Sequence, residues 1–254
     1  MHYQVAPAPL GISAAHGYGA IWMIQPQRPK EMSRFAQACL DALATSKLAP
    51  YLSLGGAFGL AHYFEYRSTH DVDAWWVEPV TSEVRRRVAR VLVETLQPYG
   101  EVRTRAWGDV VSIELLQAGK VVFSFQIALR SAQLQDLLPA PWPTGMWLDT
   151  FEDLVASKMT ALVERGAPRD FRDIYMLCRA EQCSIRQCWE LWQARQLLAN
   201  ENADAERANL AIHTHLARIE RARPLEQIAD PQQHMAAEQL RKWFLERFLH
   251  GFEN

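Results

Sequence analysis

The sequence lacks long hydrophobic runs and shows no excess of charge of either sign. No apolar stretch approaches the ~18 consecutive residues of a transmembrane helix, and the N-terminus has no basic region leading into an apolar run, so we expect neither a membrane span nor a signal peptide. Lys and Arg number 27 against 29 Asp and Glu, a formal net charge of −2. Near-neutrality excludes a protein that holds nucleic acid by its overall charge, and leaves local patches as the route to a polyanion.

Cysteine is also scarce, with four in a chain of 254 residues. Cys178, Cys183 and Cys188 are spaced five residues apart, with no histidine nearby in metal-ligand register. We interpret them first as buried or idle thiols and only second as a metal or redox site. A reduced, cytoplasmic protein is therefore expected. Hydrophobic residues make up 49% of the chain, which is enough for a full core.

Hydrophobic periodicity predicts an N-terminal half that mixes strands with helices and a C-terminal half that is helical. Residues 1–29, with several prolines and glycines, show no sustained period and are predicted to form an extended arm. The predicted strands are 51–54, 71–77, 110–116 and 121–129, the last two joined by a hairpin turn at 117–120. Helices are predicted from 29 to 50, from 58 to 66, from 82 to 98, from 151 to 164, from about 170, and over 184–198, 202–221 and 231–249.

A loop with several prolines and a glycine, 139–145, is the most plausible domain boundary. It divides the chain into an α/β domain with its N-terminal arm, residues 1–145, and a helical domain, residues 146–254. We therefore predict an α+β fold followed by a bundle of helices.

One segment combines features of a nucleotide site. The strand at 51–54 ends in Gly55-Gly56, whose backbone N–H groups, together with the start of the next helix, form an anion site. Asp71 and Asp73 are two residues apart, so on a strand both carboxylates project from one face. Two carboxylates beside a phosphate cradle suit a Mg²⁺–triphosphate. Taken singly, each feature is more often an ordinary turn or loop cap.

These residues resemble a known family. Gly55-Gly56, the spacing, and Arg67-x-Thr69-x-Asp71-x-Asp73 are similar to the first motif of DNA polymerase β-type nucleotidyltransferases, and more narrowly of the AbiEii/AbiGii toxins. The blocks 152–158, continuing to 165–166, and 169–175 resemble that group's later motifs, and the resemblance covers about residues 50–178. It implies a nucleotidyltransferase-fold mixed sheet with flanking helices, whose nucleotide site the C-terminal helices complete.

The resemblance also implies a role for each matching residue. Gly55 and Gly56 would hold phosphates, Asp71 and Asp73 magnesium, and Lys158 the triphosphate. Asp173 would be the later acid needed for activity, and the supporting positions would be Arg67, Thr69, Arg165 and Asp170. Without the resemblance, Lys158 is an ordinary solvated helix lysine, and Asp170 and Asp173 are equally well explained as caps of a helix.

The implied function is transfer of a nucleotidyl group from an NTP–Mg²⁺ complex to a hydroxyl of RNA, such as a tRNA end, or of a protein. The family setting implies a toxin of a toxin–antitoxin or phage-defence system, with an antitoxin encoded nearby and no membrane partner. The arginines at 85–105 and 165–179 are either a surface for RNA or solvated residues paired with nearby acids. Trp75 and Trp76 are expected near the nucleotide.

One departure from the superfamily pattern stands out. The third acid of these enzymes usually lies on a later strand, where this chain has Gln126, and Glu114 on the preceding strand is the nearest substitute. Because the third acid commonly serves as base and as ligand of a second metal, full two-metal catalysis is in question. A catalytically silent nucleotide-binding or interaction module is therefore the alternative. A nuclease is less favoured, since Gly55-Gly56 and Lys158 suit a triphosphate better.

Overall fold

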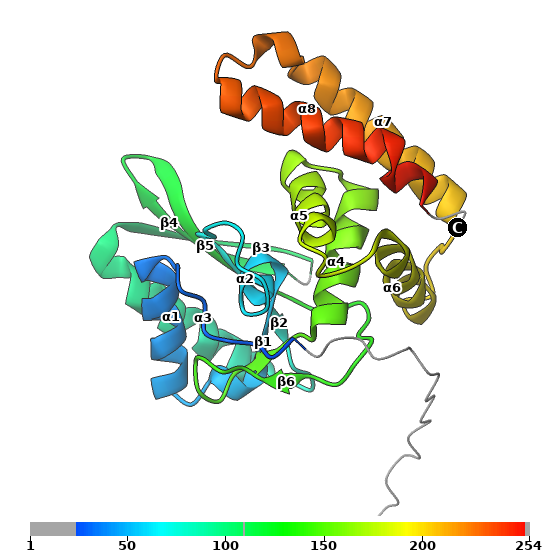
Figure 1. Ribbon diagram of the computed structural model, residues 1–254. Helices are drawn as coiled ribbons and strands as arrows, with labels where there is room; N and C mark the ends of the chain where they lie inside the picture. Colours follow the sequence, from blue (N-terminus) through cyan, green and yellow to red (C-terminus); the bar gives the residue numbers. More distant parts are fainter. Residues whose placement is uncertain (1–23, 109, 252–254) are drawn as a thin grey trace, which may run out of the picture.

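The structure, a computed structural model, describes residues 24–108 and 110–251 (Figure 1). Of the predicted N-terminal arm, residues 1–23 lie outside the described part, and residues 24–33 run without helix or strand until α1 begins. No helix of the described residues is long and apolar enough to cross a membrane.

Seven strands form one mixed sheet with the order β3-β4-β5-β2-β1-β7-β6. The pairs β2–β5 and β1–β7 are parallel, and the other neighbours are antiparallel. The strands are β1 (Leu52–Gly55), β2 (Val72–Trp76), β3 (Glu101–Trp107), β4 (Val110–Gln117), β5 (Lys120–Ala128), β6 (Leu138–Pro139) and β7 (Trp147–Leu148). The fold is therefore α+β, as predicted.

The four predicted strands are confirmed, whereas β3, β6 and β7 were not predicted. The predicted hairpin joins β4 to β5 through Ala118 and Gly119, both with positive φ (48° and 74°), which is typical of a tight two-residue turn. β3 is an edge strand whose side chains are mostly exposed, so it lacks an apolar alternation. β6 and β7 are two residues each and lie at the ends of the loop assigned as a boundary.

Two helices cover one face of the sheet, namely α1 (Arg34–Thr45) and α3 (Ser82–Leu96) (Figure 1). Along β2, Val72, Ala74 and Trp76 are buried in the core shared with these helices, and the residues between them are half-buried. Because side chains alternate along a strand, Asp73 and Trp75 project from the opposite face. The fold thus reserves one polar face of the sheet.

The short helix α2 (Gly56–Ala61) links the sheet to the C-terminal helices. Its Leu60 belongs to a second apolar cluster, whose other buried members all lie from Phe151 onward. The predicted helix continues to residue 66, but α2 ends at Ala61, because residues 62–71 form a loop tied to the N-terminal segment.

The C-terminal helices are α4 (Phe151–Glu164), α5 (Pro168–Arg179), α6 (Ile185–Leu198), α7 (Ala205–Ala222) and α8 (Pro231–Glu246), all close to their predicted positions. Single-turn helices span Ala49–Tyr51, Gln97–Tyr99, Leu225–Gln227 and Phe248–His250. Thr150 caps α4, since its side-chain oxygen accepts a hydrogen bond from the backbone N–H of Asp153. The division into domains 1–145 and 146–254 stays a prediction. The four cysteines are free; Cys39, Cys183 and Cys188 are buried and Cys178 is half-buried.

Candidate functional site

The turn between β1 and α2 brings backbone and carboxylate into close approach. Gly56 has φ +58°, and a Cβ there would lie 2.1 Å from Asp73 Oδ2. A Cβ at Gly55 would lie 2.2 Å from Trp75 Nε1. Since real Cβ atoms are not found so close to other atoms, both positions require glycine. No side chain of the described residues caps the first N–H groups of α2.

A row of residues crosses the polar face of the sheet at the level of Asp73. Asp73 lies opposite Gly55 on β1 and Gln126 on β5, and Gln126 lies opposite Ser112 on β4. Asp71, one row away, is exposed and accepts a hydrogen bond from the backbone N–H of Ser124 (2.9 Å). The predicted acid pair is therefore located on this face, next to the glycine turn.

Electrostatics at Asp73 link the sheet to the helices. Burial raises the pKa of Asp73 above its usual value, and the charge of Asp71 acts in the same direction. The positive charges of Lys158, Arg169 and Arg165 act against this shift. Cations of α4 and α5 thus face the acid pair from the other side of the site.

Asp173 on α5 is the centre of a buried cluster. Its Oδ2 pairs with Lys158 Nζ at 2.7 Å, and its Oδ1 accepts from Arg67 Nε at 3.2 Å and from the Tyr66 hydroxyl. Burial of Asp173 opposes its charge, but Lys158, Tyr66 and Arg67 outweigh burial and hold the pKa of Asp173 below its usual range. The structure therefore brings together three predicted residues, Arg67, Lys158 and Asp173.

Tyr66 was not predicted as a site residue. Burial, followed by the neighbouring charge of Asp173, raises its pKa, so the hydroxyl stays protonated and donates to Asp173. The only sequence signal is its place directly before Arg67. Its partner is 107 positions away, which no local pattern reveals.

Arg165 and Asp170 form a second pair between α4 and α5. Arg165 Nε and Nη2 each donate to Asp170 at 2.8 Å, and Asp170 Oδ2 also accepts from the backbone N–H of Ala167 (3.0 Å). Asp170 therefore caps α5, which was the explanation of this residue that did not depend on the family resemblance. At the same time it orients Arg165. Thr69 is buried, and its hydroxyl donates to the carbonyl of Asp71 (3.3 Å).

The place of the missing third acid is clear from the register. Gln126 is the β5 residue that lies opposite Asp73, so a neutral amide occupies this position. Glu114 shares the face, since it lies opposite Ser124 and Arg103. Its Oε2, however, accepts from Arg103 Nη2 at 2.6 Å and lies 3.4 Å from Arg105 Nε. Among the described residues no group of three His, Cys, Asp or Glu side chains could hold a metal.

A second buried network holds Trp75, which was predicted to lie near the nucleotide. Its indole N–H donates to Asp149 Oδ2 (3.0 Å), and Asp149 Oδ1 pairs with Arg130 at 2.6 Å. Burial raises the pKa of Asp149, while Arg130 acts against that shift. Trp75 is thereby fixed against Gly55 on the polar face. Trp76 instead lies in the core on the opposite face, contrary to expectation, because side chains alternate along β2.

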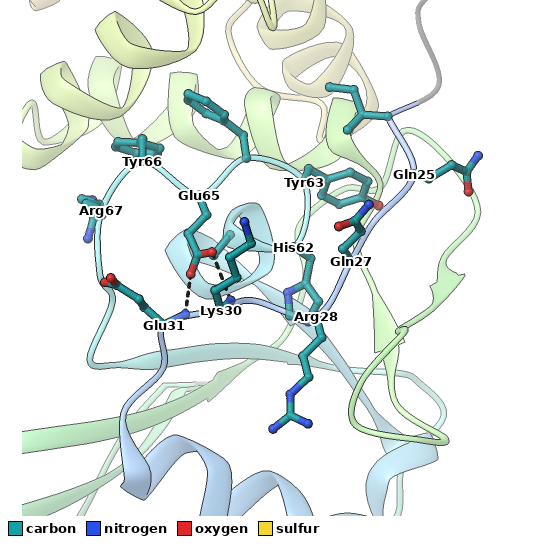
Figure 2. A pocket seen from close by; sticks show the side chains of 13 residues that line it. Gln25, Gln27, Arg28, Lys30, Glu31, His62, Tyr63, Glu65, Tyr66 and Arg67 are labelled. Carbon is teal, nitrogen blue, oxygen red and sulfur yellow. Dashed lines mark hydrogen bonds between the residues drawn. The ribbon is translucent and has the colours of Figure 1, made fainter.

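The loop that carries Tyr66 and Arg67 is fastened to residues 24–31, which we call the strap (Figure 2). The Glu65 carboxylate accepts from the backbone N–H groups of Lys30 (3.0 Å) and Glu31 (2.8 Å), and Gln27 N–H donates to the carbonyl of His62 (2.7 Å). Strap and loop together line a cavity of about 590 Å³ that reaches Arg67.

The two predicted arginine clusters differ in their partners. In the first, Arg85 pairs with Glu78, Arg86 with Glu83 (3.0 Å), and both Arg103 and Arg105 with Glu114. In the second, the α5 arginines Arg169, Arg172 and Arg179 have no ion pair with a described residue. Arg87 and Arg90 of the first cluster also have no ion pair with a described residue, but they lie on α3, which covers the opposite face of the sheet. Among the described arginines of the two clusters, the uncompensated ones beside the site are therefore those of α5.

Comparison with known proteins identifies the family of the chain. The family described as "Nucleotidyl transferase AbiEii toxin, Type IV TA system" matches residues 38–248, which include every site residue from Gly55 to Asp173. No curated protein sequence matches the chain significantly. The chain belongs to the AbiEii nucleotidyl transferase toxin family of type IV toxin–antitoxin systems.

Proposed function

We propose that this protein transfers a nucleotidyl group from an NTP–Mg²⁺ complex to a hydroxyl of RNA, and that it does so as a cytoplasmic toxin. The observation that supports this most directly is the close approach of the Gly56 backbone to the Asp73 carboxylate. The Lys158–Asp173 ion pair faces them across the site. The turn, the acids and the cations surround one face of the sheet. That is the arrangement a metal-bound triphosphate needs.

The donor set fits one magnesium ion. Asp71 and Asp73 are neighbouring carboxylates, and burial together with the charge of Asp71 raises the pKa of Asp73. A cation between them would relieve this repulsion. Magnesium typically takes one or two carboxylates and completes its shell with water and substrate phosphates, and it neutralises charge that develops on them.

The remaining residues bind and orient the triphosphate. The N–H groups at Gly55 and Gly56 would cradle phosphate oxygens, and Lys158 and Arg165 would offset their charge. Arg67 holds Asp173 in place through its ion pair, and Thr69 holds the residues that precede β2 through its hydrogen bond to Asp71. The acceptor oxygen attacks the α-phosphorus, the new O–P bond forms as the bond to the β-phosphate oxygen breaks, and pyrophosphate leaves. The hydroxyl proton passes to solvent, since Gln126 cannot accept it.

RNA is favoured over protein as the acceptor because Arg169, Arg172 and Arg179 lack carboxylate partners among the described residues and lie on the helix that carries Asp173. Unpaired arginines at a site edge bind phosphates. A tRNA end is the acceptor that we expect. An antitoxin partner follows from the family, and a role in phage defence is part of the proposal.

The test uses α-labelled NTPs, each offered with Mg²⁺ and a total RNA pool. We expect label in RNA with the wild-type protein, and none with Asp71→Ala or Lys158→Ala. Asp41→Ala, an exposed acid on α1, serves as the control and should transfer normally. Label that persists in both site variants would exclude the mechanism.

A second candidate rests on Gln126 opposite Asp73 and on the arginine partners of Glu114. Together they leave the third acid position without a free carboxylate. In that case the protein binds NTP–Mg²⁺ without transferring it. Calorimetric titration that shows binding, together with no label in RNA or protein, would identify this silent module.

A further inference from the structure

A second cavity, of about 400 Å³, lies among α5, α7 and α8, and it is separate from the polar face of the sheet. Figure 1 shows α7 and α8 side by side next to α5. The wall is largely apolar, and Phe171, Leu216 and Ile228 are among its buried members. The volume falls within the range of small-molecule sites, which is about 300–1,000 Å³.

Three guanidinium groups and no carboxylate complete the lining. Arg218 Nη2 donates to the carbonyl of Arg165 (2.7 Å), Arg241 Nη2 to the carbonyl of Arg223 (2.7 Å), and Arg223 Nη2 to Gln233 Oε1 (3.2 Å). None of the three forms an ion pair with a described carboxylate. Arg241 is only 8% exposed. Arg218 and Arg223 are exposed, so the cost of a buried charge whose partners are neutral, unless an anion compensates it, applies to Arg241.

We propose that this cavity binds a small amphipathic carboxylate, with its aliphatic chain against the apolar wall and its head group on the guanidinium groups. A carboxylate accepts two parallel N–H···O bonds from one arginine. The lining contains no hydroxyl or amide side chain. A sugar or nucleoside would therefore leave polar groups without partners, which disfavours it.

The cavity also touches the turn between α4 and α5. Gly166 lines it with φ +51°, and a Cβ there would lie 2.4 Å from the ring of His215 on α7, so the turn is tightly packed. Arg218 bonds the carbonyl of Arg165, whose side chain pairs with Asp170. A head group that draws Arg218 toward the cavity would shift this turn. We infer that the ligand changes the affinity for NTP, a step that rests on the proposed function.

Binding is tested on the full chain without nucleotide, by calorimetry with octanoate and with the neutral 1-octanol. We expect one octanoate per chain, bound at least tenfold more tightly than octanol. Arg223→Gln should weaken binding at least fivefold, and Ala237→Phe, which fills the cavity, should abolish it. Arg221→Gln is the matched control, since Arg221 is exposed in the last turn of α7, two residues before Arg223, and does not line the cavity. The Arg221→Gln variant should bind octanoate with the affinity of the wild type.

The proposal would be overturned if octanoate binding did not saturate, or if octanol bound as tightly as octanoate. It would also be overturned if Arg221→Gln weakened octanoate binding as much as Arg223→Gln does. Circular dichroism checks the fold of each variant, and Arg223→Gln suffices if Ala237→Phe does not fold. The coupling is then measured as the KM for NTP in the labelling assay, which should change at least threefold with saturating octanoate. An unchanged KM contradicts the coupling. Binding without any transfer activity contradicts the proposed function and leaves the carboxylate site intact.

Discussion

The hydrogen atom that serves as the side chain of Gly56 leaves room for the carboxylate of Asp73. Gly56→Ala would place a Cβ 2.1 Å from Asp73 Oδ2 and would force a left-handed backbone on a residue that disfavours it. We expect nucleotidyl transfer to fall at least 100-fold, measured by labelling.

The control for this change is Gly119→Ala. Gly119 also has positive φ (+74°), but a Cβ there would meet nothing within 4 Å. Both variants should lose about 1 kcal/mol from backbone strain, and Gly56→Ala should lose more. If Gly56→Ala and Gly119→Ala lost the same free energy of unfolding and both transferred nucleotide normally, the close approach of Gly56 to Asp73 would be unimportant for stability and activity.

Asp173 is a buried charge with several partners, so its removal should destabilise the protein. Asp173→Asn would leave Lys158 and Arg67 without their shared acid, and breaking such a buried pair costs about 3 kcal/mol or more. Urea unfolding at pH 7 measures the loss. Asp41→Asn on the surface of α1 should change the free energy of unfolding by less than about 0.5 kcal/mol.

The same residue predicts a pH dependence. Because the pKa of Asp173 is held below its ordinary value of about 3.9, its stabilisation is complete above that value and is lost as pH falls through the lower, folded-state pKa. The gap in unfolding free energy between wild type and Asp173→Asn should therefore narrow below about pH 4. A gap that is constant down to pH 2 would contradict this assignment.

How far single residues are predictable depends on whether their partners are local. Gly55, Gly56, Asp71 and Asp73 form a compact pattern, and the structure places them together. Tyr66 could not be found in this way, because the role of its hydroxyl depends on a residue 107 positions away. The same holds for Trp75, whose indole bonds Asp149 across 74 positions.

Among the elements, the loop between α2 and β2 depends on its fastening by the strap. Glu65→Ala removes the acceptor of two backbone N–H groups, while Glu65→Gln keeps one carbonyl acceptor. We expect the alanine variant to raise the KM for NTP several-fold, because Tyr66 and Arg67 are displaced. The glutamine variant should raise the KM less. Equal KM values in wild type and Glu65→Ala would exclude this role.

Elements with a clear apolar period were predictable, and those without one were not. α3, α4 and the β4–β5 hairpin follow from alternation and from caps such as Thr150. The strand β3 has mostly exposed side chains, so its pairing with β4 provides the only reason for its conformation. The end of α2 at Ala61 depends on the strap, which is distant in sequence.

For the whole molecule, the site joins two apolar clusters. Gly56 and Asp73 belong to the sheet half, and Lys158 and Asp173 to the helices whose core is the second cluster. A ligand that spans both should stabilise the entire fold. At 100 times its Kd, a ligand adds about 2.7 kcal/mol, so NTP with Mg²⁺ should raise the Tm by about 5 °C or more.

Thermal unfolding with each NTP, with and without Mg²⁺, checks this expectation and also ranks the four bases. Lys158→Ala should show little shift, while Lys242→Ala, an exposed lysine on α8, should respond like the wild type. A shift of equal size in Lys158→Ala would separate nucleotide binding from the proposed site.

The strap has a consequence for where a working chain can begin. The match to the family starts at residue 38, whereas the backbone groups that Glu65 binds belong to Lys30 and Glu31. A shortened chain that starts at residue 38 would retain every motif residue and would lose the anchor of the Tyr66–Arg67 loop. We therefore expect the boundary of the functional unit to lie upstream of the boundary of sequence similarity.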